Sequence, residues 1–370
     1  MASKSASLRK AQVPLSCHFC NEQAVQWKCE ECDVFMCTSC KEKIHQRLKS
    51  AQDHEIVSIS DISKENFSQR DVASEVISSV FNTYTTAVPV INSLSCSGDE
   101  DVYFTCNKLQ ERSRLVKGRM LKSSIRTLET LEKKIFDIAV NKDGETFFNE
   151  IGYKEVCILT HAGEIKTVVD TSPMIPLSLH VNKDNELIVG LREHGPPFPT
   201  TDFSIRQVMI FGKDYKRKVS LETDTKGKKM FSYPARVKTD SKNVLYVSDW
   251  FNVDLSSGRV VAVEANGRQK FTYYGNQTCK TFCPYGIAIT PSDNIILSDK
   301  NSNALHVLNT KGELLGLHFI DKEYEIKRPL SLCIDNEGYL LIGNAAIQDK
   351  KDSHANIYVT KIIEHFMSTR

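Results

Sequence analysis

The sequence predicts a mainly β protein, in which a small N-terminal finger precedes a six-bladed β-propeller. Two patterns support this fold class. Six of the 12 cysteines fall between residues 17 and 40, and a two-strand pattern recurs six times between residues 91 and 344. A dense cysteine cluster in an intracellular protein is typical of a metal-folded segment. A hairpin unit repeated along the chain is typical of radial repeat folds.

Length and composition fit a soluble protein with one large and one small domain. The 370 residues are 41% apolar, and basic and acidic residues almost balance at a net charge of +2. So small a charge gives no general attraction to nucleic acid or to an anionic membrane. The polar opening MASKSASLRKAQVPLS lacks an apolar signal core, and no run of about 18 apolar residues occurs. We therefore expect a cytoplasmic or nuclear protein without a membrane partner.

Eight cysteine and histidine residues near the N-terminus have the spacing of metal ligands. They form four pairs within 38 residues, and three of these pairs are Cys-x2-Cys. Such a pair places two thiolates on one turn, close enough to share a tetrahedral zinc ion at about 2.3 Å per bond. Each pair supplies half a site, so four pairs predict two Zn²⁺ ions. The predicted ligands are Cys17, Cys20, Cys29, Cys32, Cys37, Cys40, His45 and His54.

Zinc takes the place of an apolar core in a segment of this length. So few residues bury too little apolar surface to fold alone, whereas structural zinc contributes on the order of 10–16 kcal/mol of apparent binding energy. Protein ligands fill both predicted sites, which leaves no open position for chemistry and predicts structural zinc. His18 is an alternative to Cys20 as a ligand, but the Cys-x2-Cys spacing favours Cys20.

The segment from residue 15 to 59 resembles the B-box zinc finger of tripartite-motif proteins, on its ligand spacing and on the stretch KSAQDHEIVSI around His54. Many B-boxes have histidine at the position of Cys20, so this copy is closer to an all-cysteine form. The resemblance implies a cross-brace, with one site made of Cys17, Cys20, Cys37 and Cys40 and the other of Cys29, Cys32, His45 and His54.

Two parts that tripartite-motif ubiquitin ligases carry are not expected beside this finger. The 16 residues before Cys17 contain no cysteine or histidine for a RING finger. The roughly twenty residues after His54 are too few for the three or four heptads of a coiled coil. We therefore expect neither ubiquitin transfer by this chain alone nor coiled-coil dimerisation.

The remainder of the chain repeats a unit of two hairpins. Residues alternate between apolar and polar, with turns at Asp, Asn, Ser or Gly. The first hairpin occurs at 91–104, 136–148, 177–190, 235–249, 285–299 and 330–344, and the second at 156–169, 207–221, 259–273 and 304–319. The 293 residues from 74 to 366 give about 49 per unit, close to the length of a four-stranded propeller blade.

The ends of the repeat region predict how the ring closes. The last unit stops after NIYVTKII (356–363), one strand short, while EVISSVFN (75–82) precedes the first unit as an unpaired strand. Pairing these two strands in one blade removes the open sheet edges. We therefore expect the N-terminal strand to complete the last blade.

This pattern resembles the NHL-repeat propeller that follows the B-box in one branch of tripartite-motif proteins, most clearly in SDKNSNALHVLNTKGELL (298–315). Asp249, Asp299 and Asn344 occupy matching places in three units. They could form a cation site in the central channel or bond to backbone within their own blades, and we expect the second. The predicted organisation is a disordered N-terminus (1–14), a B-box zinc finger (15–60), a short linker (61–73) and an NHL-like propeller (74–366).

The predicted function is binding. No Gly-x-Ser-x-Gly, Walker or His-Glu-x-x-His motif occurs, and the propeller histidines do not recur at one blade position, so we expect no enzyme. By the NHL resemblance, Arg236, Tyr285 and Arg328 on the top face are candidate partner contacts.

Three hypotheses follow for the partner. The leading one is a zinc-binding adaptor that recruits a protein through its propeller and associates with itself or another protein through its B-box. The first alternative is an RNA-binding regulator, for which Arg and aromatic side chains could stack on bases; the basic stretches 212–218 and 224–229 fit it, or are solvated loops. The second alternative is a component of a RING-dependent ubiquitin ligase complex.

Overall fold

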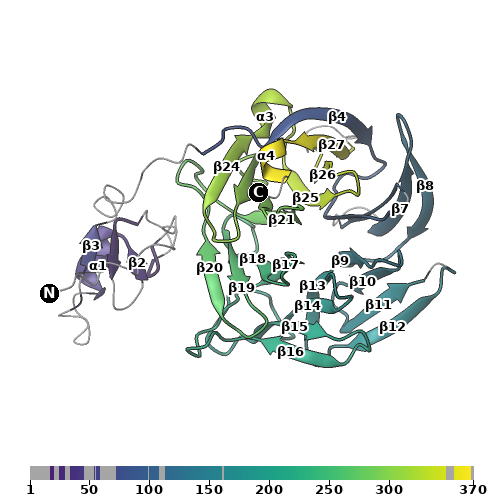
Figure 1. The fold of residues 1–370 in the computed structure, drawn as a ribbon. Helices are drawn as coiled ribbons and strands as arrows, with labels where there is room; N and C mark the ends of the chain where they lie inside the picture. The colour runs from purple at the N-terminus through teal and green to yellow at the C-terminus, as the bar shows by residue number, and fades with distance from the viewer. Residues whose placement is uncertain are drawn as a thin grey trace.

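The computed structural model describes residues 17–20, 25–29, 34–45, 54, 56–58, 72–98, 100–107, 113–160, 162–346 and 354–367. A three-stranded sheet lies in the N-terminal part, and six four-stranded antiparallel sheets form a ring in the remainder (Figure 1). The predicted mainly β fold with a six-bladed propeller is confirmed. None of the helices in these ranges is long and apolar enough to cross a membrane.

The N-terminal finger has little regular structure. Strand β1 (Trp27–Cys29) pairs antiparallel with both β2 (Val34–Met36) and β3 (Ile56–Ser58), and α1 (Thr38–Lys43) follows β2. Its buried cluster consists mainly of cysteines with a single methionine. Such a core is too small for three-residue strands to be stable alone, which agrees with a metal-supported fold.

The blades follow one another along the chain, and each runs outward from its first strand. Blade 1 contains β5 (Ser93–Cys96), β6 (Asp101–Cys106), β7 (Arg114–Met120) and β8 (Ile125–Leu131); blade 2 contains β9 (Ile135–Val140), β10 (Thr146–Glu150), β11 (Glu155–Leu159) and β12 (Ile165–Asp170). Blade 3 contains β13 (Ile175–Val181), β14 (Leu187–Arg192), β15 (Arg206–Phe211) and β16 (Arg217–Leu221); blade 4 contains β17 (Pro234–Thr239), β18 (Leu245–Trp250), β19 (Gly258–Val263) and β20 (Gln269–Tyr273). Blade 5 contains β21 (Pro284–Ile289), β22 (Ile295–Asp299), β23 (Ala304–Leu308) and β24 (Leu314–Phe319), and α3 (Ile320–Glu323) follows it.

All ten hairpins identified in the sequence are present. Residues 114–131 form a further hairpin, β7 and β8, that the sequence pattern does not predict. The turn between these strands, Leu-Lys-Ser-Ser at 121–124, lacks the Gly, Asp or Asn that marks the other turns. Alternation of apolar and polar residues was the remaining signal, and it is weak in β8, where five of seven side chains are exposed.

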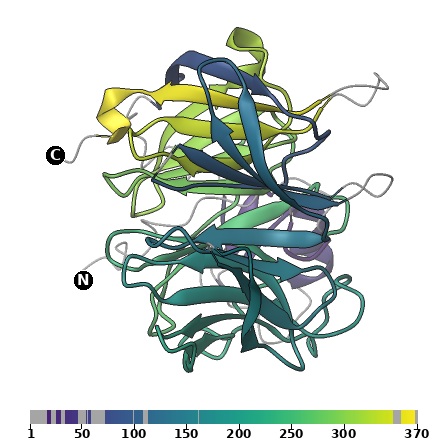
Figure 2. The same ribbon diagram turned by 90° about the vertical axis from the view of Figure 1, so that its right-hand side faces the viewer.

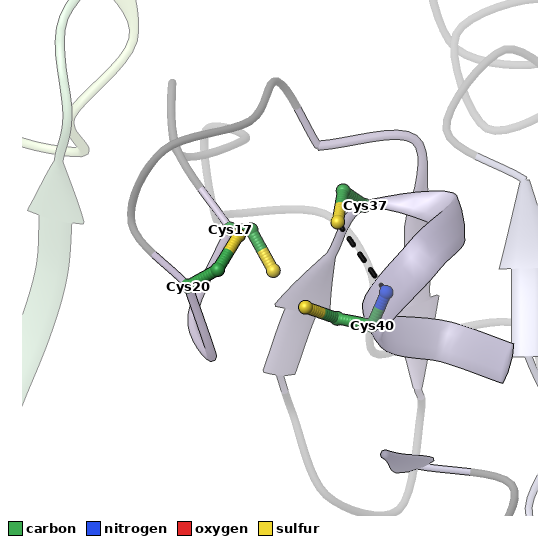
Figure 3. Close-up of side chains that lie close together, drawn as sticks. All are labelled: Cys17, Cys20, Cys37 and Cys40. Atoms are coloured by element: carbon green, nitrogen blue, oxygen red, sulfur yellow. Dashed lines mark hydrogen bonds between the residues drawn. The ribbon is translucent and has the colours of Figure 1, made fainter. Parts of the chain in front are cut away.

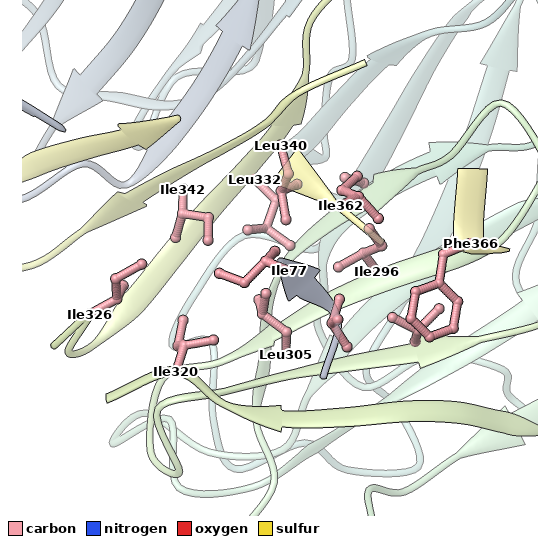
Figure 4. Packing of buried hydrophobic residues seen from close by; sticks show 13 residues of the cluster. Ile77, Ile296, Leu305, Ile320, Ile326, Leu332, Leu340, Ile342, Ile362 and Phe366 are labelled. Atoms are coloured by element: carbon pink, nitrogen blue, oxygen red, sulfur yellow. The ribbon is translucent and has the colours of Figure 1, made fainter. Parts of the chain in front are cut away.

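The ring closes as predicted. Blade 6 contains β25 (Pro329–Ile334), β26 (Leu340–Asn344) and β27 (Asn356–Ile362), and its outer strand is β4 (Ile77–Thr85), which pairs antiparallel with β27. Figures 1 and 2 show this blue N-terminal strand beside the yellow C-terminal strands. Ile77 is fully buried among Leu332, Ile342 and Ile362, and α4 (Glu364–Met367) adds Phe366 to the same cluster (Figure 4).

Neighbouring blades are also joined by side-chain hydrogen bonds. A serine or asparagine in each blade donates to a carbonyl or carboxylate oxygen of the next, and the last blade bonds back to the first. The donor and acceptor pairs are Ser93 and Asp137, Asn149 and the Pro176 carbonyl, Ser178 and the Pro234 carbonyl, Ser248 and the Pro284 carbonyl, Ser298 and the Leu330 carbonyl, and Ser331 and the Ile91 carbonyl. Each of these six donors therefore has a hydrogen-bond partner across its blade interface.

Candidate metal centre

Four cysteines of the finger converge from two short segments. Cys17 and Cys20 lie at the two ends of one turn, Cys37 caps the N-terminus of α1, and Cys40 lies in its first helical turn. The Cys40 amide donates to the Cys37 sulfur at 3.4 Å, which holds this pair together. The four sulfur atoms all lie within 4.8 Å of one another and point toward a common centre (Figure 3).

Ionisation of these four thiols is coupled to the binding of a cation among them. Burial raises the pKa of the Cys17 thiol, but hydrogen bonds from backbone amides, with that of Cys37 the largest, lower it to about 7 overall. Burial and the neighbouring thiols raise the pKa of Cys40 to about 12. Four thiolates at this separation repel one another, and a divalent ion among them offsets that repulsion. The donor set and the arrangement therefore fit zinc.

A second group alternates with the first along the chain. Cys29 ends β1, His45 follows α1, and His54 lies two residues before β3; their ligand atoms are within 4.8 Å of one another. The Cys29 sulfur is 3.5 Å from Nδ1 of His54. Two ligands at one tetrahedral zinc ion, at 2.3 and about 2.05 Å, would be roughly 3.6 Å apart. Cys32, the fourth predicted ligand, lies outside the described residues.

The two groups have the composition that the cross-brace arrangement implies, as far as the described residues extend. Cys20 is in the first group, whereas His18 is exposed and its ring lies edge-on to that of Phe19, 5.5 Å away. Zinc held by these residues would tie together segments far too short to fold by apolar burial. That is a structural role, and the number of ions remains a prediction.

Two of the three predicted partner contacts lie together at the central channel. The Arg236 guanidinium carbon is 5.4 Å from the centre of the Tyr285 ring and 5.1 Å from that of Phe136. Arg236 also donates to the Asn92 carbonyl at 2.9 Å, which connects blade 4 with the opposite blade 1. Arg236 and Tyr285 are 8% and 7% exposed, so their main contacts are within the protein. Partner binding by these two residues stays a prediction.

Arg328, the third candidate, is half-buried just ahead of β25, with a left-handed backbone φ of 53°. Its amide donates to Oδ1 of Asn303 at 2.7 Å, and its Nη1 donates to the Ala346 carbonyl at 3.1 Å. Neither bond joins Arg328 to Arg236 or Tyr285, and partner binding by Arg328 stays a prediction.

The three matching Asp and Asn positions are bonded within their blades, as expected. Asp249 accepts hydrogen bonds from the amides of Ser232 and Tyr233 at 2.7 and 2.6 Å. Asn344 donates to the Lys327 carbonyl at 3.1 Å and accepts from the Asn356 amide at 2.8 Å. In Asp299 only Oδ1 is bonded to backbone, and its buried Oδ2 has no hydrogen-bond partner.

The fold and the cysteine centre together define a class of protein, one with an N-terminal B-box zinc-binding domain and a six-bladed β-propeller. Residues 17–56 match the family model described as the ANCHR-like B-box zinc-binding domain. No curated protein matches the chain significantly.

Solved propellers are similar to this chain in fold. A putative gluconolactonase is 14% identical with a TM-score of 0.54, and the match covers 78% of this chain and 96% of that one. The calcium-binding protein regucalcin from Agrobacterium tumefaciens is 11% identical with a TM-score of 0.54, covering 77% and 94%. A gluconolactonase from Xanthomonas campestris is 13% identical with a TM-score of 0.52, covering 74% and 88%. At these identities the likeness is one of fold alone.

Proposed function

We propose that this protein is a non-catalytic, zinc-binding adaptor that recruits a protein partner through the top face of its propeller and associates through its B-box. The top face is the end of the ring where the first strand of each blade begins and where the second strand is connected to the third. This proposal includes the tripartite-motif and NHL-like character that the sequence suggested.

The observation that carries the proposal is a group of exposed apolar side chains on the top face. Phe203 is 92% exposed, Val253 70% and Tyr153 57%. They lie in the second-to-third strand connections of blades 3, 4 and 2, so three adjacent blades contribute, and Ile151 and Ile205 in the same connections are exposed as well. Large apolar groups gathered on one face are typical of protein interaction sites. Among the residues of the propeller that the structure describes, no other exposed large apolar side chain lies in such a connection.

The state of the central channel supports a non-catalytic role. Propeller hydrolases that use a metal need an open centre, but here the guanidinium of Arg236 reaches across the ring to the Asn92 carbonyl. Asp137 lies 3.8 Å from Arg236 and already accepts from Ser93 and from the Leu179 amide. The fixed positive charge of Arg236 repels cations, and the oxygens of Asp137 already accept hydrogen bonds. Cation binding in the channel is therefore unfavourable.

The B-box offers a separate surface for association. Its cysteines are mostly buried, so its contacts with other molecules must come from side chains outside the metal groups. Ile44, directly after α1, is 39% exposed and is the large apolar residue available on the described part of the finger. Ile44→Asp is therefore the change that would weaken association through this domain while leaving the ligands in place.

The test is affinity purification of the full chain from cells with chemical crosslinking, followed by mass spectrometry. We expect Phe203→Asp together with Val253→Asp to remove the crosslinked protein partner. Leu121→Asp is the matched control, because Leu121 is 44% exposed in the connection between β7 and β8, at the opposite end of the ring. Equal loss with the control, or no loss with the top-face variant, would contradict the proposal.

The RNA-binding alternative has less support. The basic stretches 212–218 and 224–229 lie toward opposite ends of β16. The first stretch lies in the turn before β16 and at its start, and the second follows the strand, so the two lie toward different faces of the ring. They do not form one basic patch, and crosslinking to RNA at physiological salt is expected to be absent. A link to ubiquitin transfer would act through a RING-bearing partner, so an autoubiquitination assay with this chain alone should be blank.

A further inference from the structure

A cluster of metal-ligand side chains lies inside the propeller, far along the chain from the B-box. Cys279 comes from the connection between blades 4 and 5, Asp299 ends β22, and His306 lies in the middle of β23. Leu297 pairs with His306 across the two strands, so Asp299, two residues further on, points to the same face of the sheet as His306. The propeller histidines do not recur at one blade position, and no spacing pattern in the sequence links these three residues.

The three ligand atoms lie close to one another and are buried away from solvent. They lie within 4.8 Å of one another, with Nε2 of His306 at 3.9 Å from the Cys279 sulfur and 4.0 Å from Oδ2 of Asp299. Exposure is 3% for Cys279 and 0% for both Asp299 and His306. Oδ2 of Asp299 is buried and has no hydrogen-bond partner, and Asp299 makes no ion pair with a lysine or arginine within the part of the chain that the structure describes.

Comparison with blade 4 shows how unusual this carboxylate is. The equivalent Asp249 has its second oxygen satisfied by Nε of Arg259, at 2.9 Å. Arg259 pairs with Asp249 across β18 and β19, and in blade 5 the corresponding partner of Asp299 is Ala304. The position of His306 is occupied in blade 4 by Val261, an apolar core residue. Blade 5 therefore lacks the arginine counter-charge of blade 4 and has an imidazole beside the unsatisfied oxygen.

The residues around the cluster hold its ligands in place. Nδ1 of His306 is 2.7 Å from the Tyr273 hydroxyl of blade 4, which leaves Nε2 turned toward the cysteine and the aspartate. Metal-binding histidines usually have their other nitrogen fixed by such a bond. The Phe282 ring packs 5.0 Å from that of His306, and a side chain on Gly275 would collide with Phe282. The glycine thus allows the connection that carries Cys279 to fold tightly against the site.

We propose that Cys279, Asp299 and His306 bind a zinc ion between blades 4 and 5. Zinc prefers sulfur, nitrogen and carboxylate oxygen ligands, and distances of 2.0–2.3 Å to each would place the ligand atoms roughly 3.4–3.6 Å apart. The two separations from Nε2 of His306, 3.9 and 4.0 Å, require a contraction of about half an ångström. A thiolate and a carboxylate neutralise the 2+ charge, so the buried assembly carries no net charge to desolvate. A water molecule would take the fourth position, because no other Cys, His, Asp or Glu of the described ranges joins the group.

The test is the zinc content of the purified full chain, measured by mass spectrometry of the metal. Because the B-box binds zinc as well, the informative quantity is the difference between variants. Cys279→Ser is expected to lose one zinc per chain. Cys283→Ser is the matched control, because Cys283 is equally buried in the same connection but outside the cluster, and its zinc content should equal that of the unmodified chain.

Two further variants keep the result decisive if Cys279→Ser does not fold. His306→Val introduces the residue found in blade 4 and should also lose one zinc per chain. Asp299→Asn should lose the same zinc and lower the melting temperature if zinc is bound. If instead Asp299 is a protonated acid in a metal-free core, its amide isostere would leave both zinc content and melting temperature unchanged. Equal zinc content in the unmodified chain and all three cluster variants would overturn the proposal.

Discussion

Closure of the ring by β4 predicts that one buried residue of this strand controls the stability of the whole propeller. Ile77 is fully buried, lies opposite Ile362 of β27 and packs into the cluster of blades 5 and 6. Ile77→Ala removes three carbon atoms from that cluster. The lost transfer free energy is about 2.4 kcal/mol at ~0.8 kcal/mol per group, and the cavity adds roughly 1–2 kcal/mol, so the expected loss is about 3.5–4.5 kcal/mol.

The measurement is equilibrium unfolding in urea, followed by tryptophan fluorescence with excess zinc so that the finger stays folded. Trp250 is buried in blade 4 and reports on the propeller. Phe81→Ala is the control in the same strand, because Phe81 is 70% exposed and its ring lies 5.4 Å from that of Tyr339 at the surface. Its expected cost is at most about 1 kcal/mol. If both variants lose the same free energy of unfolding, burial at the closing strand does not determine propeller stability.

Three other predictions follow from single features. Chelation of zinc in the full chain should make Cys17 and Cys37 react rapidly with iodoacetamide, as read by peptide mass spectrometry; unchanged protection would contradict metal ligation. Arg259→Met should cost about 3–5 kcal/mol in urea unfolding, because it leaves the fully buried Asp249 without its counter-charge, and adding Asp249→Asn should restore part of the loss. Burial, followed by the charge of Lys238, lowers the pKa of His180 well below its ordinary 6.5. The unfolded chain therefore takes up that proton first, and the free energy of unfolding should fall as the pH drops below about 6.5, by up to about 1.4 kcal/mol per pH unit; a slope unchanged by His180→Gln would show that another group is responsible.

The strands of the propeller could be predicted because the residues that determine each hairpin are close together in the sequence. Alternation sets which side chains enter a blade interface, and a Gly, Asp or Asn marks where the chain reverses, as at Gly312 with its φ of 84°. Pairing of β4 with β27 could be predicted as well, because two strands without partners remained after the hairpins had been assigned. The β7–β8 hairpin was missed because both signals are weak there.

The buried sites of the propeller could not be predicted in the same way. Arg236 bonds to Asn92, which is 144 positions earlier, only because the ring brings opposite blades together. The Cys279, Asp299 and His306 cluster draws on three segments with no regular spacing. By contrast, the finger ligands are local pairs, so their spacing predicts the ligands and the B-box resemblance predicts which pairs share a centre; Cys32 lies outside the described residues.

The six hydrogen bonds between blades limit which blade could be replaced by a copy of another. The donors differ in length and in the strand that carries them, since blade 2 uses Asn149 on β10 whereas blade 3 uses Ser178 on β13. A serine placed at position 149 would be too short by about one bond to reach the carbonyl that the asparagine amide reaches. Blade 2 is therefore specific to blade 3: a copy of blade 4 or blade 5 in its place would share the backbone plan yet bring a serine to this position, and the Pro176 carbonyl would lose the donor that Asn149 supplies.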